Sequence, residues 1–207
     1  MKKQGNLFII SAPSGAGKTT LVRWLTANIP NLYVSVSHTT RGRRPSEEDG
    51  RDYHFVDEGT FRSLIDADHF LEHALVFDHY YGTSRPWVKQ QLADGRDIIL
   101  EIDWQGAQQV HSRLPDAVGI FILPPSYETL QARLQGRGDD IDTVRRRMDE
   151  AVAELSHYRE YDFLVINEDL DTARQDLAAI IRATRQGYRR HQAYFDDFMG
   201  RILSGKT

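Results

Sequence analysis

One stretch near the start of the chain, residues 7–20, constrains the fold more than any other. Residues 7–10 are four apolar side chains in a row, which is typical of a short strand buried on both faces of a parallel sheet. A turn-rich segment follows, and a helical pattern begins at Leu21. The turn matches G-x-x-x-x-G-K-[ST], except that Ala12 stands in the place of the first glycine. The sequence therefore predicts a strand, a phosphate-binding loop and a helix in succession.

This loop has the chemistry needed to hold the phosphates of a nucleoside triphosphate. Unpaired backbone N–H groups at a helix N-terminus, together with the helix dipole, attract anions. Its glycines leave room for phosphate oxygens, Lys18 is expected to reach the β- and γ-phosphates, and Thr19 to offer its hydroxyl to Mg²⁺. The alternative, a Gly/Ser-rich turn that happens to hold a lysine, does not explain the order of strand, loop and helix. The residues expected around ATP here are Ala12, Pro13, Ser14, Gly15, Ala16, Gly17, Lys18, Thr19 and Thr20.

The composition is that of an ordinary globular protein, and it excludes several kinds of site. The 207 residues are 40% hydrophobic and 27% charged, enough for one domain with inserted subdomains. Without cysteine there are no disulfides, thiolate metal sites or cysteine nucleophile. The net charge of −4 argues against a general nucleic-acid binder. No apolar run approaches a membrane span and no secretion signal is visible, so we expect a cytoplasmic protein.

Beyond the loop, predicted strands and helices alternate along most of the chain. Strands are expected at 7–10, 32–36, 97–102, 118–123 and 163–167, and helices at 17–29, 105–113, 126–135, 143–157 and 170–185. This alternation predicts an α/β fold, with a parallel sheet, right-handed crossovers and helices on both faces. Ligands in such a fold bind beyond the carboxyl ends of the strands.

Two stretches interrupt the alternation. Residues 37–85 hold short alternating runs at 52–56 and 74–77 around a short helix at 59–67, which indicates a small α+β insertion. Residues 136–147 are polar, with glycines at one end and arginines at the other, as is typical of a mobile lid. We therefore expect a core of residues 1–36, 86–135 and 148–207, a substrate-binding insertion and a lid.

Clusters of charged side chains lie in the insertion and after a predicted strand. Arg41 and Arg44 begin a run rich in arginine and tyrosine, and such groups bind phosphate oxygens through two hydrogen bonds each. A solvated arginine turn is the alternative, because charge runs usually face solvent. The apolar strand at 97–102 ends in Glu101, followed by Asp103, and an acid beside a phosphate loop can hold Mg²⁺ or its waters.

With these strings together, the chain resembles the guanylate kinase family over nearly its whole length. The strings that carry the resemblance are 12–19, 37–45, 50–55, 70–74, 80–83, 102–106, 136–138 and 165–167. The resemblance implies phosphorylation of GMP to GDP by ATP with Mg²⁺. It also implies a P-loop NTPase-type parallel sheet, with the insertion 37–85 as the GMP-binding subdomain and 136–147 as the lid.

The resemblance further implies roles for individual residues. The residues expected at the GMP phosphate are Arg41, Arg44, Tyr53 and Tyr81. Those expected around the guanine base are Ser37, Glu72, Thr83 and Asp103. The lid arginines expected to close over the transferring phosphoryl group are Arg133, Arg137 and Arg147. Asn167, with the segment 136–138, matches the family's surroundings of the ATP adenine. Thr19 and Glu101 are expected at the metal, although the family usually has aspartate at the second position.

The chemistry of guanine supports the assignment of Glu72. Guanine presents an N1–H and a 2-amino group side by side, and one carboxylate can accept from both. Adenine has an unprotonated N1 and lacks the amino group, and sites built on such hydrogen bonds reject analogues by about 10⁴–10⁵. The nucleophile is a GMP phosphate oxygen, mostly deprotonated at neutral pH, so no general base is needed. Lys18, Mg²⁺ and the arginines then act by positioning and charge neutralisation.

Three other functions are compatible with parts of the sequence. Residues 69–73 spell H-x-x-E-H, a zinc peptidase pattern, but the following residues predict a strand rather than the required helix. Guanylate-kinase-like domains of scaffold proteins bind phosphorylated peptides without catalysis, but they characteristically degrade the phosphate loop. A kinase for another phosphorylated acceptor, such as AMP, is the third alternative. An activity assay with ATP and a panel of acceptors distinguishes it from a kinase for GMP.

The end of the chain carries an apolar stripe at helical spacing. Its members are Phe195, Phe198, Met199 and Ile202. We expect this stripe to pack on the domain, with a contact to a second copy of the chain as the alternative. The arginines before it are expected to form a solvated helix face rather than a nucleic-acid patch.

Overall fold

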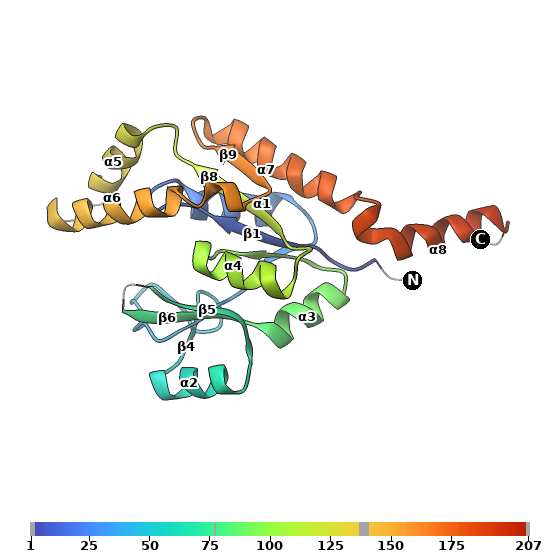
Figure 1. Cartoon of the computed structure of the whole chain (residues 1–207), viewed down its shortest axis with the longest axis horizontal. Coiled ribbons are helices and arrows are strands. Elements are labelled where there is room, and N and C mark those ends of the chain that lie inside the picture. Colours follow the sequence, from blue (N-terminus) through green and yellow to red (C-terminus); the bar gives the residue numbers. More distant parts are fainter. Residues whose placement is uncertain (1–2, 77, 137–140, 206–207) are drawn as a thin grey trace.

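A five-stranded parallel sheet forms the centre of the computed structural model, which describes residues 3–76, 78–136 and 141–205 (Figure 1). The strands, in chain order, are β1 (Leu7–Ser11), β2 (Leu32–Val34), β7 (Asp97–Leu100), β8 (Val118–Leu123) and β9 (Phe163–Ile166). Their order across the sheet is β2-β7-β1-β8-β9, and every pairing is parallel. The predicted parallel α/β fold is therefore confirmed.

Helices cover both faces of this sheet, as the alternation predicts. On one face α1 (Lys18–Asn28) and α7 (Leu170–Arg185) pack together, and on the other lie α3 (Arg85–Ala93) and α4 (Trp104–Arg113). Strand β1 serves both layers, because Phe8 and Ile10 belong to the first core while Leu7 and Ile9 belong to the second. Every residue of β1 is buried, which explains the continuous apolar run.

The insertion folds into a second sheet beside the first. Its order is β4 (His54–Phe55), β3 (His38–Thr39), β6 (His79–Ser84) and β5 (Phe70–Val76). The helix α2 (Glu58–Asp66) is capped by Asp57 and packs through Phe61, whose ring stacks on Phe70 at 4.5 Å. The predicted helix at 59–67 is present within a residue of its bounds.

The strands of the insertion differ from the sequence prediction. Residues 74–76 of the run predicted at 74–77 belong to the longer β5, and Phe77 lies outside the described residues. The run at 52–56 contributes only two residues to β4. Strand β6 and helix α3 were not predicted. The residues of β6 are largely polar, and antiparallel pairing with β5 makes them a strand. Such pairing is a long-range contact that local periodicity does not reveal.

Two further helices, α5 (Tyr127–Gln135) and α6 (Ile141–Leu155), pack against each other and extend beyond the sheet (Figure 1). Residues 137–140 of the predicted lid, including Arg137, lie outside the described residues. No helix in the described part of the chain combines the length and the hydropathy needed to cross a bilayer.

The prediction that the C-terminal stripe packs on the domain is wrong for three of its four members. The exception is Phe195, which is half-buried and has Nζ of Lys3 5.3 Å from its ring centroid. Helix α8 (Gln192–Leu203) projects away from the sheet, and it contains no buried residue (Figure 1). Phe198, Met199 and Ile202 are 44%, 46% and 56% exposed. Helical periodicity correctly indicates an apolar face, but it does not say whether the same chain covers that face.

Candidate nucleotide-binding site

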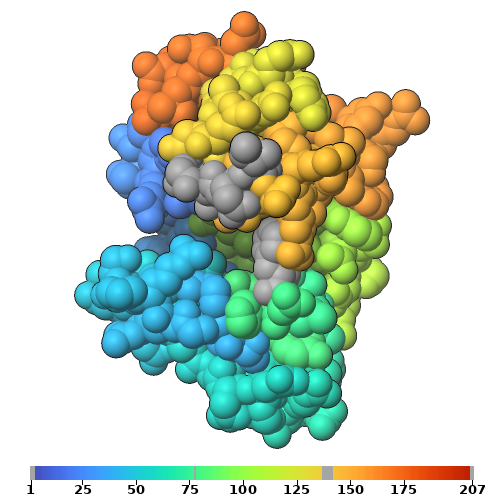
Figure 2. Space-filling model, turned by 90° about the vertical axis from the view of Figure 1, so that its left-hand side faces the viewer, coloured from blue at the N-terminus to red at the C-terminus, as the bar shows by residue number. Residues whose placement is uncertain are grey.

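A pocket of about 420 Å³ opens where β1 and β7 end, with the second sheet on its other side. Figure 2 shows this side of the molecule, with the insertion in cyan and green below the α5 and α6 segments in yellow and orange. The phosphate loop lines the pocket together with Ser37, Tyr53, Glu72, Tyr81, Glu101, Asp103 and Glu154. Segments far apart in the sequence thus meet at the carboxyl ends of the strands, as the fold class predicts.

The phosphate loop adopts a conformation that requires its glycines. Gly15 and Gly17 have φ of 91° and 95°, and Gly17 is the N-cap of α1. A Cβ on Gly17 would lie 2.4 Å from Nδ2 of Asn167. Ala12 is not among the residues with positive φ, so a methyl group is tolerated where the motif has glycine. The backbone N–H of Ala16 donates to the carbonyl oxygen of Pro13 at 3.0 Å and tightens the turn.

Asn167 and Arg133 meet beside this loop. The Asn167 amide donates to the carbonyl oxygen of Ala16 at 2.7 Å, and its side chain is buried. Nη2 of Arg133 lies 3.4 Å from the backbone oxygen of Asn167. Asn167 therefore fixes the shape of the phosphate loop directly, a contact that the sequence did not reveal.

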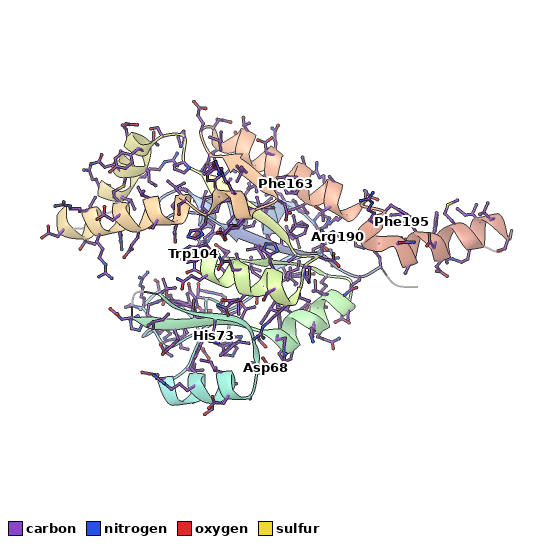
Figure 3. All side chains as sticks on the ribbon, viewed as in Figure 1. Asp68, His73, Trp104, Phe163, Arg190 and Phe195 are labelled. Atoms are coloured by element: carbon purple, nitrogen blue, oxygen red, sulfur yellow. The ribbon has the colours of Figure 1, made fainter. Side chains whose placement is uncertain are left out.

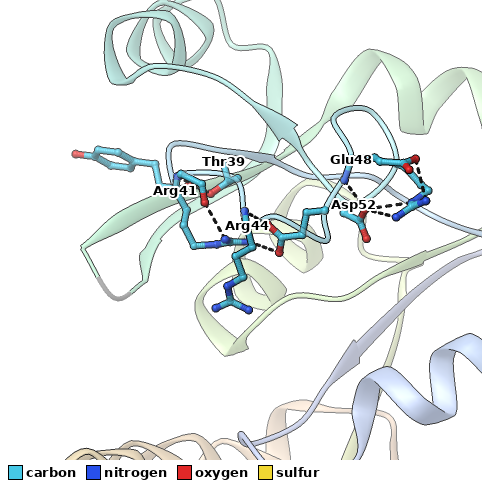
Figure 4. Close-up of polar contacts among 9 residues, drawn as sticks. Thr39, Arg41, Arg44, Glu48 and Asp52 are labelled. Atoms are coloured by element: carbon cyan, nitrogen blue, oxygen red, sulfur yellow. Dashed lines mark hydrogen bonds and ion pairs between the residues drawn. The ribbon is translucent and has the colours of Figure 1, made fainter.

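The loop expected to hold the acceptor phosphate contains a half-buried ion pair. Nη2 of Arg41 lies 2.7 Å from Oε1 of Glu47, and the two side chains are only 15% and 14% exposed. The other oxygen of Glu47 accepts from the backbone N–H of Arg44 at 2.9 Å (Figure 4). The Arg41 guanidinium also lies 5.3 Å from the ring of Tyr53. Sequence reasoning missed Glu47, although an acid within a few residues of several arginines was a usable signal.

Two of the residues expected around the guanine base, Glu72 and Thr83, come together on the second sheet. Glu72 and Thr83 are paired across β5 and β6, and both are buried. The Thr83 hydroxyl donates to Oε1 of Glu72 at 2.5 Å. Burial raises the pKa of Glu72 to about 7, and nearby Asp103 adds to this, whereas the Thr83 hydrogen bond opposes it. Asp103 accepts from the backbone N–H of Gly106 at 2.9 Å and so caps α4.

The second oxygen of Glu72 is packed closely against a glycine of α4. A Cβ on Gly106 would lie 2.8 Å from Oε2 of Glu72. The N-terminus of α4 therefore approaches the carboxylate more closely than any other residue type would allow.

The structure brings together only part of the predicted site. Ser37, Tyr53, Glu72, Tyr81, Glu101 and Asp103 line one pocket with Lys18 and Thr19. The pocket lining does not include Arg41, Arg44, Arg133 or Arg147. Arg147 lies half-buried on α6. Glu154 on the same helix lines the pocket, which no sequence pattern indicated.

The residues at the predicted metal position supply hard oxygen ligands. Thr19 and Glu101 line the same pocket, and a hydroxyl and a carboxylate are oxygen ligands that suit Mg²⁺. Within residues 3–76, 78–136 and 141–205 no group of three or more acidic or histidine side chains forms a metal cage. Residues 70–73 of the H-x-x-E-H pattern lie in strand β5, as the sequence indicates, and not on the helix that a zinc peptidase site requires.

Comparison with known proteins agrees with this geometry. A sequence model of the family described as guanylate kinase matches residues 4–184. The guanylate kinase of Aromatoleum aromaticum is 57% identical, covering 93% of this chain and 97% of that protein. The guanylate kinase of Chromohalobacter salexigens is 54% identical, covering 97% of this chain and 94% of that protein.

The fold is shared as well. The crystal structure of guanylate kinase from Anaplasma phagocytophilum superposes with a TM-score of 0.75 at 34% identity, covering 91% of this chain and 90% of that one. The resemblance stated from the sequence is therefore confirmed. Sequence, phosphate loop and fold agree over nearly the full length, and the chain belongs to the guanylate kinase family.

Proposed function

We propose that the pocket transfers the γ-phosphoryl group of ATP to GMP, giving ADP and GDP. Membership of the guanylate kinase family makes the chain a nucleoside monophosphate phosphotransferase. The observation that carries the proposal is one pocket that joins the phosphate loop, with Lys18 and Thr19, to the buried carboxylate of Glu72. The phosphate loop suits the phosphates of a nucleoside triphosphate, and the Glu72 carboxylate suits the paired hydrogen-bond donors of guanine.

On the donor side, the loop from Ala12 to Thr20 holds the ATP phosphates through its backbone N–H groups. Lys18 neutralises charge on the β- and γ-phosphates, and Asn167 keeps the loop in its binding shape. The adenine is expected near Arg133 and Asn167, which lie beside the loop.

On the acceptor side, Glu72 accepts hydrogen bonds from the guanine N1–H and 2-amino group. Ser37 and Asp103 complete the surroundings of the base, and Thr83 orients Glu72. The GMP phosphate is held by Arg41, Arg44, Tyr53 and Tyr81. Glu47 holds Arg41 in the loop until GMP arrives.

Thr19 and Glu101 would hold Mg²⁺ from the protein side, together with the ATP phosphates. The bound ion would neutralise charge on the phosphates. The extra methylene of Glu101, relative to aspartate, suits contact through a water molecule.

Transfer then requires only alignment and charge neutralisation. A GMP phosphate oxygen attacks the γ-phosphorus in line with the leaving oxygen of ADP, without a general base. Closure of the lid (136–147) is expected to bring Arg147 and Arg137 onto the transferring group. Core (1–36, 86–135, 148–207) and GMP-binding subdomain (37–85) would move together around the substrates.

A coupled ADP-release assay tests the proposal. ATP and Mg²⁺ are offered with GMP, AMP and a ribose phosphate in turn, and product GDP is identified directly. We expect turnover with GMP and its loss when EDTA removes the metal. Binding of GMP without GDP formation would indicate a scaffold-type module, and equal rates for AMP and GMP would contradict the role of Glu72.

We further propose that the protein works in the cytoplasm on these two small substrates, without a nucleic-acid or membrane partner. The exposed stripe of α8, including Phe198 and Ile202, fits a contact in a homo-oligomer. Light scattering of the purified chain, compared with a Phe198→Ser variant, measures that assembly.

A further inference from the structure

One acidic side chain of the pocket has no part in the chemistry above. Glu154 lies on α6 and lines the pocket with Lys18 and Asp103. Among the residues that the structure describes, its Oε2 atom is buried without a hydrogen-bond partner. An enclosed carboxylate oxygen without a donor is unfavourable, so a nearby cationic or hydroxyl donor would stabilise it.

The end of α6 that carries Glu154 is fixed to α4. The ring of His157 stacks on that of Trp104, with centroids 3.7 Å apart and planes 8° apart. Figure 3 shows Trp104 at the start of α4, below α6. Nδ1 of His157 lies 2.6 Å from Oε1 of Glu160, whose other oxygen accepts from Gln108 at 2.9 Å. These contacts hold Glu154, one turn earlier, over the pocket.

Glu154 also shares a helix face with the lid arginine. Positions 147, 150 and 154 follow spacings of three and four, so Arg147, Glu150 and Glu154 lie on one side of α6. The apolar side of the helix packs on α5 instead. One helix carries both side chains, so a movement of α6 that displaces Glu154 would displace Arg147 as well.

The charges around Glu154 indicate which group can satisfy it. A carboxylate accepts hydrogen bonds, and so do phosphate oxygens, so the phosphates of the nucleotides cannot be its partners. Burial, Asp103 and Glu150 raise the pKa of Glu154 to about 7, whereas Lys18 of α1 opposes this rise. Tyr161, between α6 and β9, is a further neighbour. The side chain of Lys18 forms no hydrogen bond or ion pair with any residue in the described ranges.

We propose that Glu154 is a positioning residue for Lys18. Before ATP binds, the Glu154 carboxylate attracts the Lys18 ammonium group and keeps it over the phosphate loop. When the phosphates arrive, Lys18 exchanges the carboxylate for phosphate oxygens, and the part of α6 that carries Arg147 closes while the end near His157 stays against α4. This inference rests on the proposed role of Lys18 and adds a link between the donor site and the lid helix.

ATP affinity provides the first test, measured by calorimetry on the full chain without GMP at about pH 8, where Glu154 is ionised. Glu154→Gln removes the charge but keeps the size, so we expect ATP to bind about threefold to tenfold more tightly while kcat falls. Glu154→Asp keeps the charge and should bind ATP much as the wild type does. Asp149→Asn, an exposed position on the same helix, is the control with an equal charge change. Unchanged or weaker ATP binding by folded Glu154→Gln would overturn the proposal.

The second test follows the Glu154 carboxyl group by ¹³C NMR in nucleotide-free protein. Lys18→Met should raise the pKa of Glu154 by about one unit, because the attracting charge is lost. Arg23→Met removes a charge from the exposed face of the same helix and should leave the titration unchanged. An unchanged titration in Lys18→Met overturns the pairing. This readout needs no turnover, so its failure is distinct from an absence of GDP formation in the wild type.

Discussion

The Thr83 hydroxyl lies 2.5 Å from Oε1 of Glu72, and the two side chains are 0% and 3% exposed. They come from neighbouring strands of the second sheet. Thr83 thus occupies one oxygen of the carboxylate, while the other lies close to Gly106 of α4, and Glu72 is a lining residue of the pocket. This arrangement makes Glu72 both the proposed guanine sensor and a buried ionisable group, and the two properties are separately measurable.

Glu72→Gln should relax the preference for guanine. The amide can donate to the unprotonated N1 of adenine, and it accepts from guanine less well than a carboxylate does. We expect the ratio of kcat/KM for GMP over AMP to fall by about 10²-fold or more, with phosphate binding retained. Thr83→Val keeps the carboxylate and is the control, for which most of the discrimination should persist. An unchanged ratio in Glu72→Gln would remove Glu72 from base recognition.

The same substitution should change how stability depends on pH. The pKa of Glu72 is raised from 4.5 to about 7 in the folded chain, so the native state holds a proton that the unfolded state releases between these values. Stability contributed by the protonated group is therefore lost as pH rises toward 7 and above. Relative to wild type, Glu72→Gln should gain about 2–3 kcal/mol in unfolding free energy between pH 5 and pH 8. Urea unfolding of both proteins at the two pH values measures this.

The comparison also has an internal control. Glu154, whose pKa is raised to about 7, and His38, whose pKa is lowered to about 4, are present in both proteins, so their contributions cancel. An equal stability difference at the two pH values would contradict the raised pKa of Glu72.

Lys18→Ala should abolish most of the catalysis without unfolding the chain. Lys18 begins α1, is half-buried and lines the pocket, so its loss removes charge at the transferring phosphate but little packing. We expect kcat to fall by about 10²-fold or more and the melting temperature to change little. The coupled assay and thermal unfolding measure the two effects, with Arg23→Ala on the same helix as the control. Wild-type turnover in Lys18→Ala would contradict the role of Lys18 in neutralising charge at the transferring phosphate.

Glu47→Ala should weaken GMP binding selectively. Glu47 holds Arg41 by an ion pair and the backbone of Arg44 by a hydrogen bond, so its removal frees the loop that binds the acceptor phosphate. Because these contacts are lost in Glu47→Ala, we expect the KM for GMP to rise about tenfold and the KM for ATP to stay unchanged. Glu48→Ala is the matched control, because Glu48 is 65% exposed and its side chain pairs only with Arg51 within the described part of the chain. A raised KM for ATP as well would show that Glu47 supports the whole domain instead.

The parallel sheet and the phosphate loop could be predicted because local patterns specify both. An all-apolar run such as 7–10 belongs to a strand covered on both faces, and β1 is buried throughout. The glycines of the loop were predicted for the space they leave, and Gly15 and Gly17 indeed take positive φ. The ends of the strands then bring Glu101 and Asp103 to the loop, since parallel strands end at one edge of the sheet.

By itself, the sequence determined the fold class, the phosphate loop and the acidic strand end, because each depends on side chains close together along the chain. Only the tertiary structure decided that Asn167 binds the loop, that Glu47 holds Arg41, that Glu154 reaches the pocket and that α8 stays uncovered. The physical reason is that periodicity reveals which face of an element is apolar or charged. Which other element that face meets is fixed by packing between segments distant in the chain.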